Sequence, residues 1–250
     1  MNKAADFKLL IDNSNTRTKL MFSCGGELLP NQLIIPTCEL KAAKLQSVVY
    51  GYEFSRVVVC SVVPSAANEI SEAFGERVHF ITPQDVLAVD FEYDGLSTLG
   101  ADRIANIAGC VLYGRVPCVA VDLGTAITFD VLAERGGRPV FVGGSIAPGL
   151  STMSQSLSQK TALLPAISLS GKPNAVAKNT VGAMQSGCLF GCAGLVRELL
   201  TVISDELGCR PFVIATGGDS SLIFNMNVGI DVVDPLLTFK GLNEVARHLL

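Results

Sequence analysis

The sequence is poor in charged residues and in histidine. Charged residues make up 17% of the 250 residues, and the net charge is −4, whereas soluble domains usually carry about 25% charged residues. This balance gives no general attraction to nucleic acid or to an anionic membrane, so we expect neither as a partner. His79 and His248 are isolated and indicate neither a metal site nor a Ser–His pair. The chemistry is therefore expected to depend on other residue types.

The cysteines do not form a metal-binding or disulfide pattern. Eight are scattered through apolar segments without a Cys-x-x-Cys pair, and Cys188 and Cys192, one helical turn apart, have no other metal-type cluster nearby. We interpret them as small buried thiols in a reducing compartment. No apolar run approaches the roughly 18 residues of a membrane-spanning helix, and Met1–Ile11 lacks a long apolar signal region. A cytoplasmic protein is expected.

The order of strand-like and helix-like segments predicts an α/β fold. A chain of 250 residues fits one large domain or two of about 125 residues. Arg56–Val63 has the composition of a buried strand, Ser65–Phe74 that of a short helix, and Arg77–Ile81 that of another strand, which is typical of α/β layers. Gly114–Pro117 is the best candidate for a boundary, which gives predicted domains 1–114 and 115–250.

Val119–Asp130 contains two apolar runs that flank Asp122 and the turn residues after it. This pattern predicts a buried strand, a tight turn and a returning strand. Gly124 permits close approach of a ligand to the backbone, Thr125 offers a hydroxyl, and the turn can present N–H groups to an anion. The alternative is a plain hairpin in which Asp122 is only a turn residue.

A similar pattern occurs near the start of the chain. Ile11–Asn15 and Val121–Thr125 both read as strand, Asp, any residue, small residue and polar residue, and their aspartates lie 122 − 12 = 110 positions apart. This spacing, close to half the chain, predicts an internal duplication with an Asp-bearing hairpin in each half. Chance similarity of two short segments is the alternative.

Aspartates at strand ends, tight turns of small residues and the late Thr216-Gly217-Gly218 segment favour a nucleotide site. A phosphate chain requires backbone N–H groups, a cation and carboxylates that hold the cation. The sequence contains neither a Gly-x-x-x-x-Gly-Lys-[Ser/Thr] P-loop nor a dinucleotide-binding Gly-x-Gly-x-x-Gly between a strand and a helix. A different class of nucleotide-binding fold is indicated.

An ordered set of short segments resembles the type III pantothenate kinases of the acetate/sugar kinase–Hsp70–actin superfamily. The segments are Asp12–Lys19, Ser61–Pro64, Gly100–Arg103, Asp122–Ala126, Gly143–Gly149, Asn179–Thr180, Ala183–Gly187 and Thr216–Gly218. The resemblance implies two duplicated actin-like (ribonuclease H-like) α/β domains with an ATP cleft between them. It also implies ATP-dependent phosphorylation of pantothenate to 4′-phosphopantothenate, the first step of coenzyme A biosynthesis, by a homodimer.

The resemblance also implies a role for individual residues. ATP with Mg²⁺ is implied as one substrate, and its expected contacts are Asp12, Asn13, Ser14, Asn15, Thr16, Arg17, Thr18, Lys19 and Thr125. The expected pantothenate contacts are Tyr93, Gly100, Ala101, Asp102, Arg103 and Thr180, with Asp102 as the catalytic base. Asp122 is the expected ligand of an activating monovalent cation, K⁺ or NH₄⁺.

The chain departs from the family pattern at two places. Ser14 stands where the family usually has glycine, and a Cβ there costs about 1 kcal/mol or more if the backbone has positive φ or nearly touches phosphate. We expect altered nucleotide affinity rather than its loss. Asp94-Gly95-Leu96 replaces a segment that often contains proline, which weakens the assignment of Tyr93.

Simpler interpretations exist for some of these residues. Asp102 and Arg103 fit a helix N-terminal acid beside a surface arginine, and Lys19 fits a solvated strand residue. At the level of function, the alternatives are a superfamily kinase for another small alcohol and a non-catalytic nucleotide-binding regulatory homologue. Ser14 favours the regulatory homologue, whereas Asp102, Asp122 and Thr180 argue against it.

Overall fold

The computed structural model describes residues 7–169 and 173–249, which form two compact units. Of the described residues, unit 1 contains 7–114, 135–141 and 236–249, and unit 2 contains 115–134, 142–169 and 173–235. The chain therefore returns to unit 1 twice after Gly114. The domain ranges 1–114 and 115–250 stay a prediction, because the two units are defined only by how compactly their residues pack and not as separate domains.

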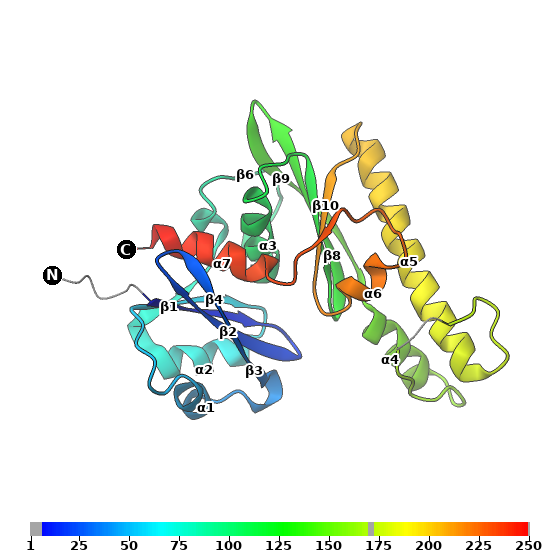
Figure 1. The fold of residues 1–250 in the computed structure, drawn as a ribbon, viewed down its shortest axis with the longest axis horizontal. Helices are drawn as coiled ribbons and strands as arrows, with labels where there is room; N and C mark the ends of the chain where they lie inside the picture. Colours follow the sequence, from blue (N-terminus) through cyan, green and yellow to red (C-terminus); the bar gives the residue numbers. More distant parts are fainter. Residues whose placement is uncertain (1–6, 170–172, 250) are drawn as a thin grey trace. The chain divides into compact units, whose positions relative to one another are not determined.

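Unit 1 is a five-stranded sheet with helices on both faces (Figure 1). The strand order is β3-β2-β1-β4-β5, with β1 antiparallel to β2 and parallel to β4. The strands are β1 (Phe7–Asn13), β2 (Arg17–Cys24), β3 (Glu27–Pro36), β4 (Arg56–Ser61) and β5 (Val78–Phe80). The α-helices are α1 (Ala42–Val48), α2 (Pro64–Phe74), α3 (Ala101–Val111) and α7 (Leu237–His248).

Burial on both faces explains why β1 reads as a continuous apolar run. Leu9, Leu10 and Ile11 are each fully buried, as expected for a strand with helices on both sides of the sheet. Leu9 and Ile11 point to the same face and share a core with Ile70 and Phe74 of α2. On the opposite face α3 and α7 cover β1 and β4.

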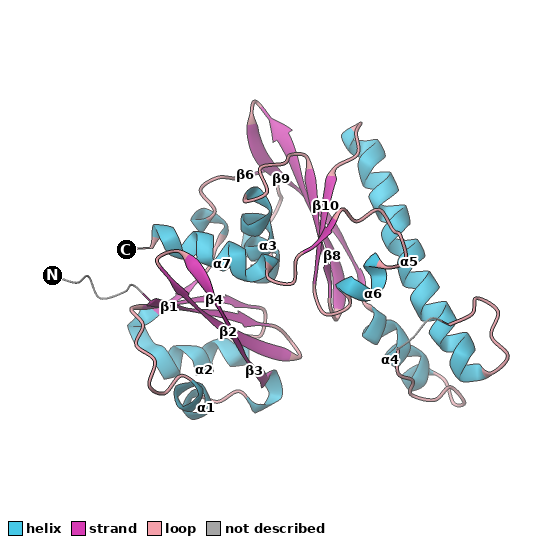
Figure 2. Ribbon diagram, in the orientation of Figure 1, coloured by secondary structure: helices cyan, strands magenta, loops and turns pink. Residues whose placement is uncertain are grey.

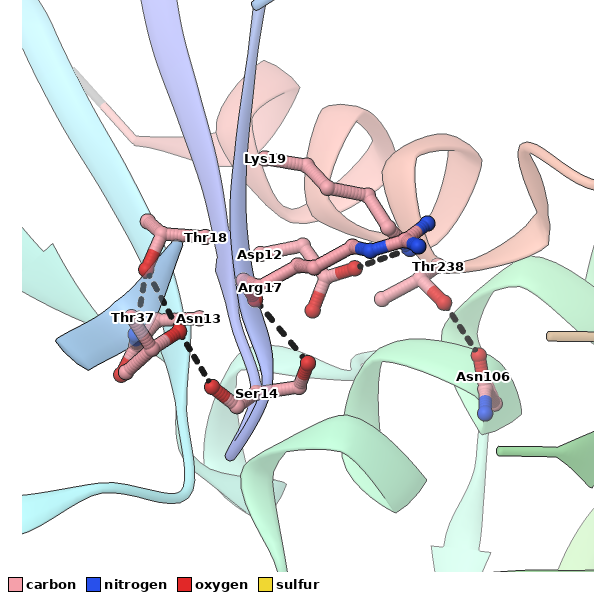
Figure 3. Close-up of polar contacts among 9 residues, drawn as sticks. All are labelled: Asp12, Asn13, Ser14, Arg17, Thr18, Lys19, Thr37, Asn106 and Thr238. Carbon is pink, nitrogen blue, oxygen red and sulfur yellow. Dashed lines mark hydrogen bonds and ion pairs between the residues drawn. The ribbon is translucent and has the colours of Figure 1, made fainter. Parts of the chain in front are cut away.

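Helices α3 and α7 approach each other closely because glycine occupies the contact. A Cβ on Gly241 would lie 1.8 Å from the carbonyl oxygen of Ala105, and one on Gly109 would lie 2.5 Å from the carbonyl oxygen of Leu237. Beside this contact, the Thr238 hydroxyl lies 2.8 Å from the Asn106 side-chain oxygen in a buried hydrogen bond (Figure 3). The C-terminal helix thus fixes the position of α3 in unit 1.

Unit 2 has a mixed sheet with helices gathered on one face (Figure 2). In it the strand order is β11-β10-β7-β8-β9. The strands are β7 (Cys118–Leu123), β8 (Ala126–Arg135), β9 (Arg138–Pro148), β10 (Phe212–Thr216) and β11 (Val232–Val233), and the helices are α4 (Leu150–Lys160), α5 (Thr180–Leu207) and α6 (Ser220–Phe224). The first residues of β9 belong to unit 1, where they pair in parallel with β6 (Asp90–Phe91).

The longest helix, α5, forms much of the core of unit 2. Leu189, Cys192 and Val196 of α5 pack against Val121 and Phe129 of the sheet. By length and composition alone this helix is long and apolar enough to span a membrane, and 44% of its most apolar window is buried in the protein. A core helix passes the same test, so the finding is weak support for a membrane span.

The two sheets repeat the same topology, which confirms the predicted duplication. In unit 1 β1 pairs antiparallel with β2 and parallel with β4, and in unit 2 β7 pairs antiparallel with β8 and parallel with β10. Asp12 lies opposite Lys19 near the end of β1, and Asp122 lies opposite Thr128 near the end of β7. The α/β class and the duplicated topology are thus both present.

Several local predictions need correction. Strand β3 was not predicted, because it is largely exposed and contains Pro30 and Pro36, so it shows no apolar alternation. The helix predicted over 37–52 is shorter, with a 3₁₀ turn at Thr37–Glu39 before α1. The predicted loop 90–99 contains β6 and a 3₁₀ turn at Leu96–Thr98.

Candidate active site

The turn between β1 and β2 is held by a chain of buried side-chain hydrogen bonds (Figure 3). The Asn13 amide nitrogen donates to the Thr18 hydroxyl at 2.7 Å, and the hydroxyls of Thr18 and Thr37 lie 3.1 Å apart. Ser61 donates to the Asn13 side-chain oxygen at 2.6 Å. Asn13 is 1% exposed and Thr18 is fully buried. These two predicted ATP contacts therefore support the hairpin from inside.

The tip of the same hairpin carries the exposed residues. Asn15, Thr16 and Arg17 are exposed, and Ser14 is half-buried. The backbone N–H and the hydroxyl of Ser14 both donate to the Arg17 carbonyl oxygen, at 3.1 and 3.0 Å. Among the described non-glycine residues positive φ is found at Asn227 alone. The conformation of Ser14 is therefore free of left-handed strain, and its hydroxyl stabilises the turn.

An ion pair joins the two strands of the hairpin. Lys19 Nζ lies 3.1 Å from Asp12 Oδ2, with side-chain exposures of 30% and 9%. The Arg17 side chain extends along the same side of the hairpin (Figure 3). Lys19 is thus half-buried and paired and is not a fully solvated strand residue. Two cations and a carboxylate thus lie together beside a polar turn.

Asp102 lies in the first turn of α3 and folds back over Gly100. Its Oδ1 accepts the Arg103 backbone N–H at 2.8 Å, and a Cβ on Gly100 would lie 2.5 Å from that oxygen. A side chain at 100 would therefore require the Asp102 carboxylate to move, whereas the Gly100 φ of −58° is open to any residue. Burial raises the pKa of the Asp102 carboxyl, the Arg103 N–H opposes this, and the negative charge of Asp12 adds to the increase. The carboxylate is thus a stronger base than an exposed aspartate.

Arg103 is buried against aromatic rings. It is 6% exposed, and its guanidinium carbon lies 5.8 Å from the centroid of Tyr93 and 5.5 Å from that of Phe141. The two rings are themselves 5.3 Å apart. The simpler interpretation of Arg103 as a surface residue is therefore wrong, and Tyr93 lies beside Arg103. Phe141 was missed, since it comes from β9 and no motif marks it.

Unit 2 holds Asp122 in a turn shaped by glycines. A Cβ on Gly217, whose φ is +90°, would lie 2.5 Å from both Asp122 Oδ1 and the Leu123 carbonyl oxygen. A Cβ on Gly149 would lie 2.0 Å from the Gly124 carbonyl oxygen. The backbone therefore closes around the half-buried Asp122 carboxylate at the end of β7. Carboxylate and carbonyl oxygens are the donors that hard cations prefer, so Asp122 and the Leu123 carbonyl are the groups of this turn that could hold a cation.

The remaining predicted residues of unit 2 lie on separate elements. Thr125 is exposed in the β7–β8 turn, where its carbonyl oxygen accepts the Gly149 N–H at 3.0 Å and the Thr152 hydroxyl at 2.6 Å. Thr180 is the exposed first residue of α5, after the N-cap Asn179. Residues 7–169 and 173–249 contain no group of three or more His, Cys, Asp or Glu that would hold a metal ion.

Asp219 is a further acid of unit 2 that sequence reasoning missed. Its backbone N–H donates to the Leu123 carbonyl oxygen at 3.0 Å, directly after the Thr-Gly-Gly segment. Burial raises the pKa of its carboxyl. Its position in the sequence after Gly218 was the available signal.

The residues predicted from the sequence form two groups. Unit 1 holds Asp12–Lys19, Tyr93 and Gly100–Arg103, and unit 2 holds Asp122, Thr125 and Thr180.

The profile of the type III pantothenate kinases matches residues 8–202 of the chain. The chain belongs to this family. A type III pantothenate kinase of Akkermansia muciniphila is 45% identical over 95% of this chain and 97% of its own length. The corresponding enzyme of Methylacidiphilum infernorum is 36% identical over 97% of this chain and 89% of its own. Members of the family are phosphotransferases, so the two groups of polar residues belong to an enzyme.

Solved structures at lower identity share the fold. A Campylobacter jejuni protein described as a Baf family transcriptional activator has a TM-score of 0.57 at 21% identity and covers 96% of both chains. A ROK family glucokinase of Streptomyces griseus, in complex with glucose and AMPPNP, has a TM-score of 0.54 at 12% identity, covering 96% of this chain and 98% of its own. These solved structures share the fold alone with this chain, and that fold agrees with the actin-like architecture.

Proposed function

We propose that the chain transfers the γ-phosphoryl group of ATP to pantothenate and forms 4′-phosphopantothenate, the first step of coenzyme A biosynthesis. The observation that carries the proposal is the family match over residues 8–202, together with 45% identity to a type III pantothenate kinase across 95% of the chain. The polar residues of unit 1 support it, because they include the carboxylate of Asp102, the cations Arg17 and Lys19, and the β1–β2 turn.

Asp102 is the proposed catalytic base. Phosphoryl transfer depends mainly on positioning and on neutralisation of charge, and the acceptor hydroxyl must lose its proton as the transfer proceeds. The Asp102 carboxylate accepts that proton. Its raised pKa makes it a better acceptor, and a well-placed base contributes about 10²–10⁴-fold to the rate.

The β1–β2 hairpin is the proposed phosphate-binding element. Backbone groups of the exposed tip from Ser14 to Arg17, with the side chains of Arg17 and Lys19, bind the phosphate oxygens of ATP. Asn13 and Thr18 hold the hairpin in shape through their buried hydrogen bonds. Asp12 supplies the carboxylate oxygen that Mg²⁺ prefers, and the bound ion would neutralise phosphate charge.

Arg103 and its neighbours are the proposed pantothenate contacts. Pantothenate carries a carboxylate, and an arginine presents a permanent charge with several N–H donors to such a group. Tyr93 lies beside Arg103, and Gly100 and Ala101 contribute backbone groups at the start of α3. Thr180 contributes a hydroxyl from the first turn of α5.

Asp122 is the proposed ligand of K⁺ or NH₄⁺. Its carboxylate and the nearby backbone carbonyl of Leu123 would hold the ion, which supplies fixed positive charge in the turn. Thr125, two residues beyond Leu123, is the proposed ATP contact of unit 2.

The active form is proposed to be a cytoplasmic homodimer without nucleic-acid or membrane partners. On α5, Phe190 and Val202 are 45% and 41% exposed. Gly187, Gly191 and Gly194 lie on the same side of this helix, and a Cβ on any of them would enter open space. This side of α5 also carries the exposed Arg197 and Glu198, and its small residues permit close packing of a second helix, which supports self-association.

The decisive assay uses purified protein with ATP, Mg²⁺ and K⁺, and measures ADP release and product mass with and without pantothenate. Pantothenate-dependent ADP release with formation of 4′-phosphopantothenate supports the proposal. Turnover with another small alcohol alone would indicate a different superfamily kinase. ATP binding without turnover of pantothenate or any alcohol would indicate a regulatory homologue.

A further inference from the structure

Aromatic rings from two distant parts of the chain enclose the Arg103 side chain in unit 1. The Phe141 and Tyr93 rings lie 5.3 Å apart at an interplanar angle of 49°, and the Arg103 guanidinium is within 6 Å of both centroids, at 5.5 Å and 5.8 Å. Phe91 packs edge-on to Phe141 at 5.8 Å. A guanidinium at this distance from a ring face is attracted by the negative face of the ring. Both the Tyr93 ring and the Arg103 guanidinium therefore contact the Phe141 ring.

Backbone pairing explains how Phe141 reaches this place. Phe91 of β6 is the parallel partner of Phe141 of β9, and the Glu92 N–H donates to the Phe141 carbonyl oxygen at 2.9 Å. One residue earlier in β6, Asp90 forms a two-fold ion pair with Arg138, with N···O distances of 2.9 and 3.2 Å. The segment that leads into Tyr93 is thus fastened to β9 by backbone and side-chain bonds.

We propose that Phe141 is a positioning residue for pantothenate binding, which acts by holding the Arg103 guanidinium and the Tyr93 ring in one arrangement. This inference rests on the proposed function. Phe141 is fully buried, so it acts through its neighbours and does not touch the substrate. An arginine side chain that is already stacked loses less freedom when it binds a carboxylate, because its planar fork is held in advance.

The chain supplies a matched control at Phe91. Phe91 packs on the same ring and pairs in the same strand register, but the ring contacts of Arg103 are with Tyr93 and Phe141. A purely structural role predicts that Phe141→Leu, at the fully buried ring, weakens pantothenate and ATP binding alike, and that Phe91→Leu, at the half-buried ring, does the same to a smaller extent. A positioning role predicts an effect of Phe141→Leu alone.

The test measures KM for pantothenate, KM for ATP and kcat in the full-length protein. Phe141→Leu should raise KM for pantothenate roughly tenfold, the size of loss expected for a buried cation–ring contact, with kcat and KM for ATP within about threefold of wild type. Phe91→Leu should leave all three within about threefold. Phe141→Tyr, which keeps the ring, should restore much of the pantothenate affinity. Equal effects of the two leucine variants, or an unchanged KM for pantothenate in Phe141→Leu, would overturn the proposal.

A double-mutant cycle with Arg103→Lys tests the route of action. If Phe141 acts through Arg103, then Phe141→Leu should raise KM for pantothenate much less in the Arg103→Lys background than in wild type. Full additivity would contradict the proposal. Phe141→Met, which fills the site with a flexible chain, is measured in the same way if the leucine variant does not fold.

A readout without substrate separates this inference from the proposed function. With 3-fluorotyrosine incorporated at the four tyrosines, the ¹⁹F resonance of Tyr93, assigned by Tyr93→Phe, should shift or broaden in Phe141→Leu and stay in place in Phe91→Leu. An unaltered resonance in Phe141→Leu would refute positioning. Absence of pantothenate turnover in the wild type would refute the proposed function and leave this spectroscopic result to decide the role of Phe141.

Discussion

Replacing Asp102 with asparagine removes the proposed base while keeping the shape of the side chain. The amide oxygen can still accept the Arg103 N–H that the Asp102 carboxylate accepts at 2.8 Å, so the start of α3 should keep its structure. Turnover should fall by roughly 10²–10⁴-fold, or about 2.7–5.4 kcal/mol of transition-state stabilisation at 1.36 kcal/mol for each factor of ten. KM for ATP should stay close to the wild-type value.

The same substitution should leave the fold as stable as wild type or more stable at neutral pH. Burial and the charge of Asp12 raise the folded-state pKa of Asp102 above its ordinary value of 3.8. Because the folded-state pKa is raised, the protonated Asp102 carboxyl stabilises the folded protein at pH values below its unfolded-state pKa. This stabilisation is lost as the pH rises through the folded-state pKa. At neutral pH the wild type therefore keeps an unfavourable buried charge that Asp102→Asn does not have.

Steady-state assays and thermal unfolding check both halves of this prediction. The acid limb of kcat/KM in the wild type should lie above 3.8, the ordinary pKa of an aspartate, and should be absent from the residual activity of Asp102→Asn. Turnover within about threefold of wild type would exclude Asp102 as the base. A large loss of stability together with the loss of activity would show that its role is structural.

Three further substitutions, with Gly218→Ala as the control for the first, test the packing and the two Asp-bearing hairpins. Gly241→Ala places a Cβ 1.8 Å from the Ala105 carbonyl oxygen and should lower the free energy of unfolding by roughly 1–3 kcal/mol, whereas Gly218→Ala, whose Cβ would meet open space, should cost less in the same denaturant titration. Ser14→Gly removes a hydroxyl bond within the hairpin and should reduce stability by about 1 kcal/mol and change KM for ATP without abolishing turnover; a complete loss of activity would contradict this. Asp122→Ala should abolish or alter the K⁺ dependence of turnover, and an unchanged rate in K⁺, NH₄⁺ and Na⁺ buffers would remove its cation role.

The Asp-bearing hairpins were predictable because their signal is local. A buried strand that ends in a carboxylate and a tight turn occupies only a few residues, and both Asp12 and Asp122 appear at the predicted place. The repeat of this pattern also predicted the duplicated topology. The roles of these residues in binding stay predictions, since sequence pattern and fold leave ligand contacts open.

The surroundings of Asp102 and Arg103 were not predictable in the same way. Burial of Arg103 against Tyr93 and Phe141 depends on the pairing of β6 with the start of β9, and these strands are about 50 residues apart. Close packing of Gly241 on α3 likewise depends on a helix from the far end of the chain. Such contacts arise from tertiary structure and leave no periodic signal in a single sequence.

Direct measurement of pantothenate phosphorylation by the purified protein tests the central claim. With ATP, Mg²⁺ and K⁺ present, the account predicts one 4′-phosphopantothenate formed for each ADP released, and background ADP release when pantothenate is omitted. ADP release that does not respond to pantothenate under any of the cation conditions would contradict it.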